Sequence, residues 1–179
     1  MARRYDPERR QRIIDAAIRV VADKGIGGLS HRTVAAEADV PLGSTTYHFS
    51  TLDDLLVAAL RQANANARAF FEERLGTVGD DGLAAVIARL TGEWMAHERS
   101  GAELEYELYL AALRRPALRP VAAEWGRWFA EQLAGRTDPV TAKALVALVD
   151  GICLQALLTG ADYDEEYARE ALSRVVRAP

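Results

Sequence analysis

Apolar residues recur along this chain at the three- and four-residue spacing that is typical of amphipathic helices. The first such stretch starts behind Asp6-Pro7, where an N-cap residue precedes a proline suited to the first helical turn. It ends at Lys24-Gly25, a basic last turn followed by a glycine. The apolar face between these ends consists of Ile13, Ile14, Ala17, Ile18 and Val21. The pattern predicts a helix of about four turns.

Two shorter elements and a long one follow. Ser30 is expected to cap a short helix that breaks at Asp39-Val40-Pro41, and residues 43–48 are too few to form a stable helix alone. Thr51 and Asp54 have the spacing of a capping box, with Asp in place of Glu, and open a long helix toward Leu75.

The rest of the chain repeats the helical pattern over residues 83–97, 102–113, 117–134, 138–158 and 164–177, with Asp138-Pro139 as another cap-and-proline start. No segment alternates as a strand would. We therefore predict an all-α fold of about nine helices. The expected division is a three-helix head over residues 1–50 and a helical body over residues 51–179.

The composition suits a helical protein, and the charge is distributed unevenly along the chain. Half of the residues are apolar, and the net charge of −4 argues at first against a polyanionic partner. Eight basic and six acidic residues, however, give residues 1–50 a charge of +2, so that the remainder carries −6. The single Cys153 allows no internal disulfide, no signal-peptide pattern is found, and we expect a cytoplasmic protein. The apolar run 142–161 is interrupted by Lys143, Asp150 and Gln155, which favours a buried helix over a membrane span.

Residues 29–56 have the pattern of a helix-turn-helix, in which the second short helix is expected to expose Ser44, Thr45, Thr46, Tyr47 and His48. Tyr47 and His48 can donate to phosphate oxygens, and Gly43 allows close approach to a groove. An ordinary polar helical corner is the alternative interpretation.

The ordered pattern resembles the tetracycline-repressor (TetR) family of bacterial transcription regulators over about the first 57 residues. The residues that carry the resemblance are Arg10–Ile14, Ala16-Ala17, Gly25, Ser30–Ala35, Ala38, Val40, Gly43, Tyr47-His48-Phe49 and Leu55-Leu56. It implies a helix-turn-helix DNA-binding head and a C-terminal ligand-binding and dimerisation domain. Beyond residue 57, only the number, order and length of the helices match.

The resemblance also implies which residues contact DNA. Leu42, Gly43, Ser44 and Thr46 fall at base-reading positions, Arg32 falls where some members use arginine on a base, and phosphate contacts fall on Ser30, Tyr47, His48 and Thr51. The full predicted set is Ser30, Arg32, Thr33, Leu42, Gly43, Ser44, Thr45, Thr46, Tyr47, His48 and Thr51. The chain departs from the family pattern at Leu52, where a lysine is common, at Asp39 in place of a turn glycine, and at Pro41 in place of a serine. These departures affect the operator sequence rather than the fold.

Two further predictions concern the body. An apolar cavity with a few polar groups is the usual form of a ligand site, and the predicted lining is Asn64, Phe70, Trp94, Tyr106, Glu107, Leu110, Trp125, Trp128, Phe129 and Gln155. Aromatic residues at helical spacing more often belong to a plain core than to a pocket. The family's dimerisation helices correspond to residues 138–158 and 164–177, with the interface expected at Leu145, Leu148, Val149, Ile152 and Leu157. A helix that is buried on all sides is the alternative there.

Enzymatic chemistry finds little support in the sequence. His31, His48 and His97 have no metal-ligand spacing with one another or with Cys153, and no phosphate loop or nucleophile elbow is present. We expect no metal, cofactor or catalytic residue. The predicted function is a homodimeric repressor that a small molecule releases from a near-palindromic DNA operator. An all-α interaction module without specific DNA binding is the alternative.

Overall fold

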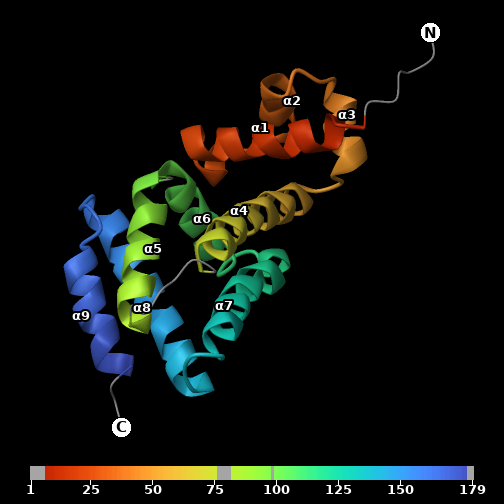
Figure 1. The fold of residues 1–179 in the computed structure, drawn as a ribbon. Helices are drawn as coiled ribbons and strands as arrows, with labels where there is room; N and C mark the ends of the chain where they lie inside the picture. The colour runs from red at the N-terminus through yellow and green to blue at the C-terminus, as the bar shows by residue number, and fades with distance from the viewer. Residues whose placement is uncertain (1–6, 76–81, 98, 177–179) are drawn as a thin grey trace. The chain divides into compact units, whose positions relative to one another are not determined.

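The computed structural model describes residues 7–75, 82–97 and 99–176, and within these ranges helices joined by turns form all of the regular secondary structure, without a strand. Figure 1 shows the helices in chain order. They are α1 Arg9–Lys24, α2 His31–Glu37, α3 Leu42–His48, α4 Leu52–Leu75, α5 Leu83–His97, α6 Arg99–Ala111, α7 Arg119–Leu133, α8 Pro139–Thr159 and α9 Glu165–Val176, with 3-10 turns at Ile26–Gly28 and Pro116–Leu118. The predicted all-α fold is confirmed.

The chain forms two compact units. The head unit comprises Met1–Ala63 and Leu104–Val121, and the body unit comprises Asn64–Glu103 and Ala122–Pro179. Helix α4 therefore starts in the head unit and ends in the body unit. The boundary that the sequence placed at residue 50 stays a prediction.

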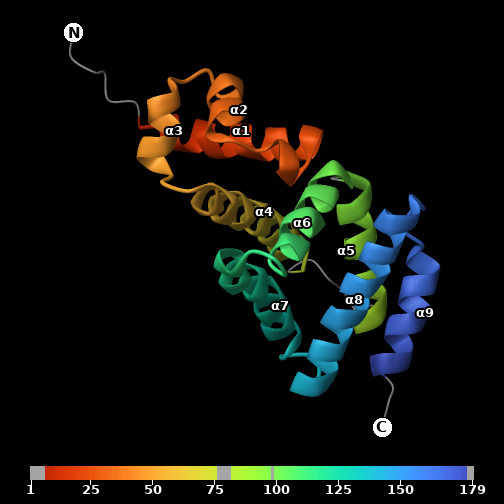
Figure 2. The same ribbon diagram turned by 180° about the vertical axis from the view of Figure 1, so that it is seen from behind.

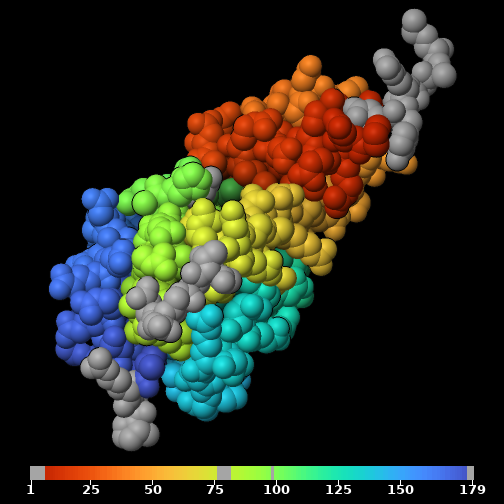
Figure 3. All heavy atoms as spheres, in the orientation of Figure 1, coloured from red at the N-terminus to blue at the C-terminus, as the bar shows by residue number. Residues whose placement is uncertain are grey.

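Helices α1, α2 and α3 build the core of the head unit. Ile13, Val21 and Val34 are fully buried there, and Phe49, just behind α3, is 3% exposed. The guanidinium of Arg10 lies 5.0 Å from the centre of the Phe49 ring. Figure 3 shows the atoms of α1 packed against those of the two helices that follow. This packing stabilises α3, which has only seven residues.

Local signals place the ends of these helices. Ser30 caps α2, as predicted, and Asp39 adopts the left-handed backbone conformation (φ 51°) that lets the chain turn sharply into α3. The Thr51 hydroxyl accepts from the Asp54 amide at 3.0 Å, and the Asp54 carboxylate accepts from the Thr51 amide at 2.9 Å. This confirms the capping box of α4.

Some boundaries differ from the prediction. Glu8 occupies the N-cap position of α1 without a side-chain hydrogen bond, and the predicted cap Asp6 lies outside the described residues. Helix α6 begins at Arg99 rather than at residue 102, because the polar residues before Ala102 extend the helix without extending its apolar face. A 3-10 turn at Pro116–Leu118 precedes α7, since a proline favours the first positions of such a turn.

Helices α5, α8 and α9 lie side by side in the body unit, as Figures 1 and 2 both show. Leu90, Leu145 and Leu172 from the three helices are at most 1% exposed. Asp138 caps α8 by accepting from the amides of Val140 and Thr141 at 2.9 and 3.1 Å. Helix α8 is long and apolar enough to cross a membrane by length and composition, a property that core helices of soluble proteins share.

Candidate nucleic-acid interface and ligand site

The outer face of α3 exposes large side chains to solvent. Tyr47 is 81% exposed and Leu42 is 45% exposed, although both side chains are large and partly apolar. Gly43 and Thr46 are also exposed, whereas His48 is half-buried beside Tyr47, with the two ring centres 5.1 Å apart. Exposed tyrosine and leucine on so short a helix indicate a surface that meets a partner.

The expectation that α3 also exposes Ser44 and Thr45 is wrong. Ser44 is 2% exposed and Thr45 is fully buried, with its hydroxyl donating to the Leu42 carbonyl at 2.8 Å. Consecutive residues of a helix differ by about 100° in direction, so one pair must face α2 when Leu42, Gly43, Thr46 and Tyr47 face outward. Ser44 and Thr45 are small and polar, as DNA-contacting residues often are, so the sequence alone did not show that they face inward.

The predicted residues on α2 divide into a cap and an exposed side chain. The Ser30 hydroxyl accepts from the Thr33 amide at 3.0 Å, and the Thr33 hydroxyl accepts from the Ser30 amide at 2.8 Å and donates to the Gly28 carbonyl. Both hydroxyls thus hold the start of α2. Arg32 between them is exposed.

The start of α4 lies close behind α3 in the chain. Thr51 is exposed and engaged in the capping box, and the hydroxyl of Ser50 donates to the Asp54 carboxylate at 2.8 Å. These hydrogen bonds from Ser50 and Thr51 hold the pKa of Asp54 below its usual value. The carboxylate is therefore charged at neutral pH, at the positive end of the helix dipole.

Two contacts inside the head unit join its helix-turn-helix side to the end of α6. Arg115 pairs with Asp53 at 2.5 Å, and the Glu107 carboxylate accepts from the Ile26 amide at 2.7 Å. Glu107, predicted to line the ligand site, thus uses one carboxylate oxygen to hold the backbone where α1 turns toward α2, and its ligand role stays a prediction. The sequence could not show this, because 81 residues separate the partners.

An aromatic cluster occupies the body unit. Its members come from α4, α5 and α7, and they are Phe70, Phe71, Trp94, Trp125, Trp128 and Phe129. The structure thus brings together five of the predicted ligand residues. The prediction missed Phe71, whose ring centre lies 5.4 to 6.3 Å from those of Phe70, Trp94, Trp125 and Phe129. Its adjacency to Phe70 was the available signal.

The other predicted ligand residues lie elsewhere. Tyr106 and Leu110 belong to the head unit, where Leu110 is 39% exposed. Gln155 is exposed on α8, and Asn64 is a buried residue of α4. None of these four takes part in the ring contacts of the aromatic cluster.

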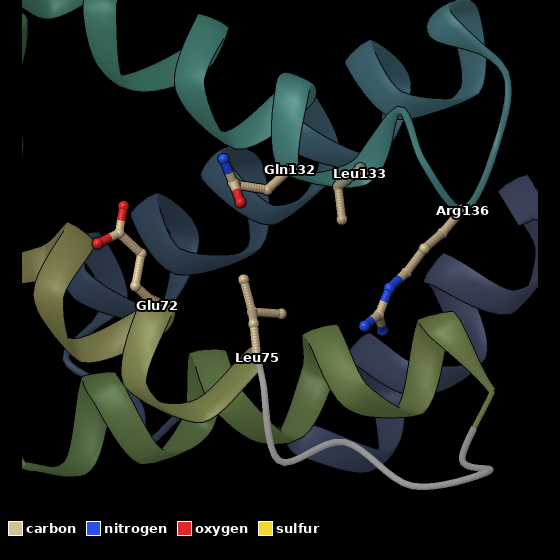
Figure 4. Close-up of a pocket in the computed structure, with 5 residues that line it drawn as sticks. All are labelled: Glu72, Leu75, Gln132, Leu133 and Arg136. Atoms are coloured by element: carbon tan, nitrogen blue, oxygen red, sulfur yellow. The ribbon is translucent and has the colours of Figure 1, made fainter.

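A pocket of about 270 Å³ opens between α4 and the end of α7 (Figure 4). Leu75 and Leu133 point toward each other across its floor, while Glu72 and Gln132 project from facing helices on one side and Arg136 on the other. Glu72 follows Phe71 directly, and Gln132 lies three residues beyond Phe129. The lining of the pocket contains no member of the aromatic cluster, but both are built from α4 and α7, and Glu72 offers a carboxylate to a ligand.

Two arginines lie on rings of the aromatic cluster. The guanidinium of Arg74 is 3.8 Å from the centre of the Phe70 ring and pairs with Glu73 and Glu93. The guanidinium of Arg68 is 5.4 Å from the centre of a Trp128 ring, and its Nη2 donates to the Glu124 carbonyl at 3.2 Å. The Nε of Arg68 is buried and has no acceptor among the described residues.

The predicted dimer residues prove to be mostly internal. Leu145 is fully buried, and Val149 and Ile152 are 8% and 9% exposed, because they face α5 and α9 of the same body unit. Side chains that are already covered gain little from a partner, so burial in the single chain does not favour these three as interface residues, and their interface role stays a prediction. Leu148 and Leu157 are half-buried. The exposed face of α8 instead carries Val140, Lys143, Ala144, Ala147, Gly151, Gln155 and Leu158.

Comparison with known proteins agrees with this architecture. Residues 13–59 match the family model of bacterial regulatory proteins of the tetR family, and residues 78–178 match the tetracyclin repressor-like C-terminal domain. The HTH-type transcriptional regulator BetI of Cronobacter sakazakii is 24% identical to the chain, over 96% of the chain and 90% of BetI.

Solved structures give the same result. The multidrug binding protein EbrR, crystallised with imidazole, is 67% identical with a TM-score of 0.91, over 97% of this chain and 98% of that one. A TetR-family member from Streptomyces coelicolor is 66% identical with a TM-score of 0.88, over 96% and 100% of the two chains. EbrR has also been crystallised with ethidium, malachite green and proflavin. The chain belongs to the TetR family and is a ligand-responsive, DNA-binding transcriptional regulator.

Proposed function

We propose that this regulator acts in the cytoplasm as a homodimeric repressor, without catalytic chemistry of its own, and that a small molecule in the body unit releases it from a near-palindromic operator. The exposed face of α3 carries the proposal, because Tyr47 and Leu42 stay in solvent where a lone domain would cover them. In such a dimer the two α3 helices enter major grooves about one helical turn, ~34–36 Å, apart.

The corrected geometry divides the DNA contacts by role. Leu42, Gly43 and Thr46 face the groove floor, and the Tyr47 hydroxyl and His48 contact phosphates. Arg32, exposed on α2, reads a base. Ser44 and Thr45 fix α3 on α2 from inside, while Ser30, Thr33 and Thr51 present capped helix starts to the phosphate backbone.

The dimer is expected to form through the exposed side of α8. Its small residues Ala144, Ala147 and Gly151 allow two helices to approach closely, and Val140 and Leu158 are 78% and 71% exposed at the two ends. In the monomer this apolar stripe lies in water, so its burial against a second copy would contribute stability of association. Sedimentation at micromolar concentration should therefore show a dimer, and a Gly151→Arg variant should sediment as a monomer.

The proposed ligands are flat aromatic cations. EbrR, at 66–67% identity, binds such dyes in its crystal structures, and the aromatic cluster offers ring faces to planar molecules. Glu72, which lines the pocket between α4 and the end of α7, supplies a carboxylate for the positive charge. Glu72→Gln should therefore weaken proflavin binding to the protein while leaving the free energy of unfolding nearly unchanged, since the side chain is exposed.

DNA binding is tested by fluorescence anisotropy on the duplex upstream of the chain's own gene. Tyr47→Phe should weaken binding to all sequences, because a phosphate contact carries no sequence information, whereas Arg32→Ala should relax preference at one base pair. Arg169→Ala on α9 serves as the charge-matched control for Arg32. Equal binding of the wild type to the upstream duplex and to random DNA would contradict the proposal.

A further inference from the structure

Arg68 is a cation beside an aromatic ring, and none of the described residues forms an ion pair with it. It lies half-buried on α4 in the body unit, against a Trp128 ring and the Glu124 carbonyl. Its contact with Glu124 is to the main-chain carbonyl and not to the carboxylate. Arg74, the other arginine on the aromatic cluster, differs because Glu73 and Glu93 pair with it.

The unused donor of Arg68 faces inward. Nε is shielded from solvent and has no acceptor among the described residues, while Nη2 beside it uses a single hydrogen bond, to the Glu124 carbonyl. Nε and Nη2 together form the side of a guanidinium that takes both oxygens of a carboxylate. A buried donor without an acceptor is costly, so an acceptor that reaches Nε gains the full strength of a charge-assisted hydrogen bond.

The position of Nε restricts what that acceptor can be. Nε is shielded from solvent and the guanidinium lies on a Trp128 ring, so an acceptor that reaches Nε must also contact the aromatic side chain beside it. A flat aromatic molecule that bears a carboxylate meets both conditions: its ring stacks on the indoles and its carboxylate meets Arg68. A flat cation should bind less well next to Arg68, because Arg68 already occupies a face of Trp128 and repels a second positive charge.

We propose that Arg68 sets the charge preference of the ligand site, so that the regulator binds planar aromatic carboxylates through Arg68 in addition to aromatic cations. The inference rests on the proposed ligand site in the body unit and extends it to a second ligand class. Arg68 and Glu72, one helical turn apart on α4, then act as opposite selectors: the first holds anions and the second holds cations.

Two ligands of similar three-ring shape and opposite charge test this directly. Proflavin and 9-anthracenecarboxylate are titrated separately into the purified full chain, in the absence of DNA, and binding is followed by ligand fluorescence. Arg68→Met should weaken binding of the carboxylate about ten-fold and strengthen binding of proflavin about three-fold. Arg68→Lys should also weaken the carboxylate, because a lysine lacks the planar fork, without strengthening proflavin.

Opposite changes for the two ligands cannot arise from a general folding defect. Arg169→Met, which removes the same charge from an exposed site on α9, should leave both dissociation constants unchanged. The proposal is overturned if Arg68→Met shifts both constants in the same direction or shifts neither, or if the wild type does not bind the carboxylate. Failure of the wild type to bind proflavin alone would instead contradict the proposed cationic ligands, and the carboxylate titration would still decide the role of Arg68.

Discussion

At the scale of single residues, the direction of a side chain on a short helix separates contact from support. The sequence of α3 offers five polar residues in a row, and composition cannot tell which of them face inward. The fully buried Thr45 and the 81% exposed Tyr47 are only two positions apart. Residue types suited to DNA could thus be predicted, but the inward pair depends on how α3 packs against α2.

This distinction predicts different consequences for two conservative changes. Thr45→Val removes the buried hydrogen bond to the Leu42 carbonyl and should lower the free energy of unfolding by about 1 kcal/mol. Tyr47→Phe should leave that free energy within error of the wild type and weaken DNA binding. Urea unfolding and anisotropy on both variants check the pair; a stable Thr45→Val protein with a DNA defect of the same size would show that Thr45 contacts DNA instead.

At the scale of elements, helix ends were predictable and helix partners were not. Capping residues act within four positions, so Ser30, Thr51 and Asp138 were recognisable in the sequence. Burial along α8 is decided by α5 and α9, and the whole helix is apolar, so no pattern distinguished its core side from its exposed side. The sequence therefore placed Leu145 and Ile152 in the interface, although both are covered within the single chain.

Glycines inside helices give a matched test of packing in the body unit. A Cβ at Gly126 of α7 would meet Val146 at an ordinary 3.9 Å, so Gly126→Ala should stabilise the protein by about 0.5–1 kcal/mol through helix propensity. A Cβ at Gly92 of α5 would lie 3.2 Å from the Tyr163 ring, and this crowding should cancel that gain. Thermal unfolding of both variants measures the difference; equal stabilisation by both would mean that the Tyr163 ring yields freely.

The start of α4 should respond to acid. The pKa of Asp54 is lowered in the folded chain by hydrogen bonds from Ser50 and Thr51, so this group stabilises the fold above its unfolded pKa of about 3.9. The contribution is lost as the pH falls through the lower folded value. The stability difference between the wild type and Asp54→Ala should accordingly be constant from pH 7 to pH 5 and shrink below pH 4. A difference that grows in acid would contradict this origin.

At the scale of the whole molecule, regulation requires that a ligand in the body unit changes the head unit. Helix α4 belongs to both units, and within the head unit Asp53 at its start pairs with Arg115 behind α6. A coupling free energy of about 1–3 kcal/mol between ligand binding and DNA binding, the usual range for allosteric proteins, would be sufficient. The family resemblance predicted this division of labour, whereas the contacts that join α4 and α6 to the helix-turn-helix are long-range and visible in the structure alone.

Breaking those contacts should uncouple the two sites. Arg115→Met combined with Glu107→Gln removes the ion pair to Asp53 and weakens the hydrogen bond to the Ile26 amide. We expect malachite green to bind this variant as it binds the wild type but to release DNA less effectively. Ligand and DNA titrations on the same preparation separate the effects, and an unchanged ratio of DNA affinities with and without the dye would exclude these contacts from the coupling.

The most direct test of a dimeric repressor that a ligand releases from DNA is sedimentation of a fluorescent upstream duplex with the full chain, with and without malachite green. A dimeric repressor controlled from the body unit should form a complex of one duplex with a whole number of dimers, which the dye dissociates for the wild type and does not dissociate at the same concentration for Glu72→Gln. Because the variant differs only in the ligand pocket, the comparison excludes direct action of the dye on DNA. A complex that carries a single chain, or one that the dye dissociates equally from both proteins, would contradict a dimeric repressor controlled from the body unit.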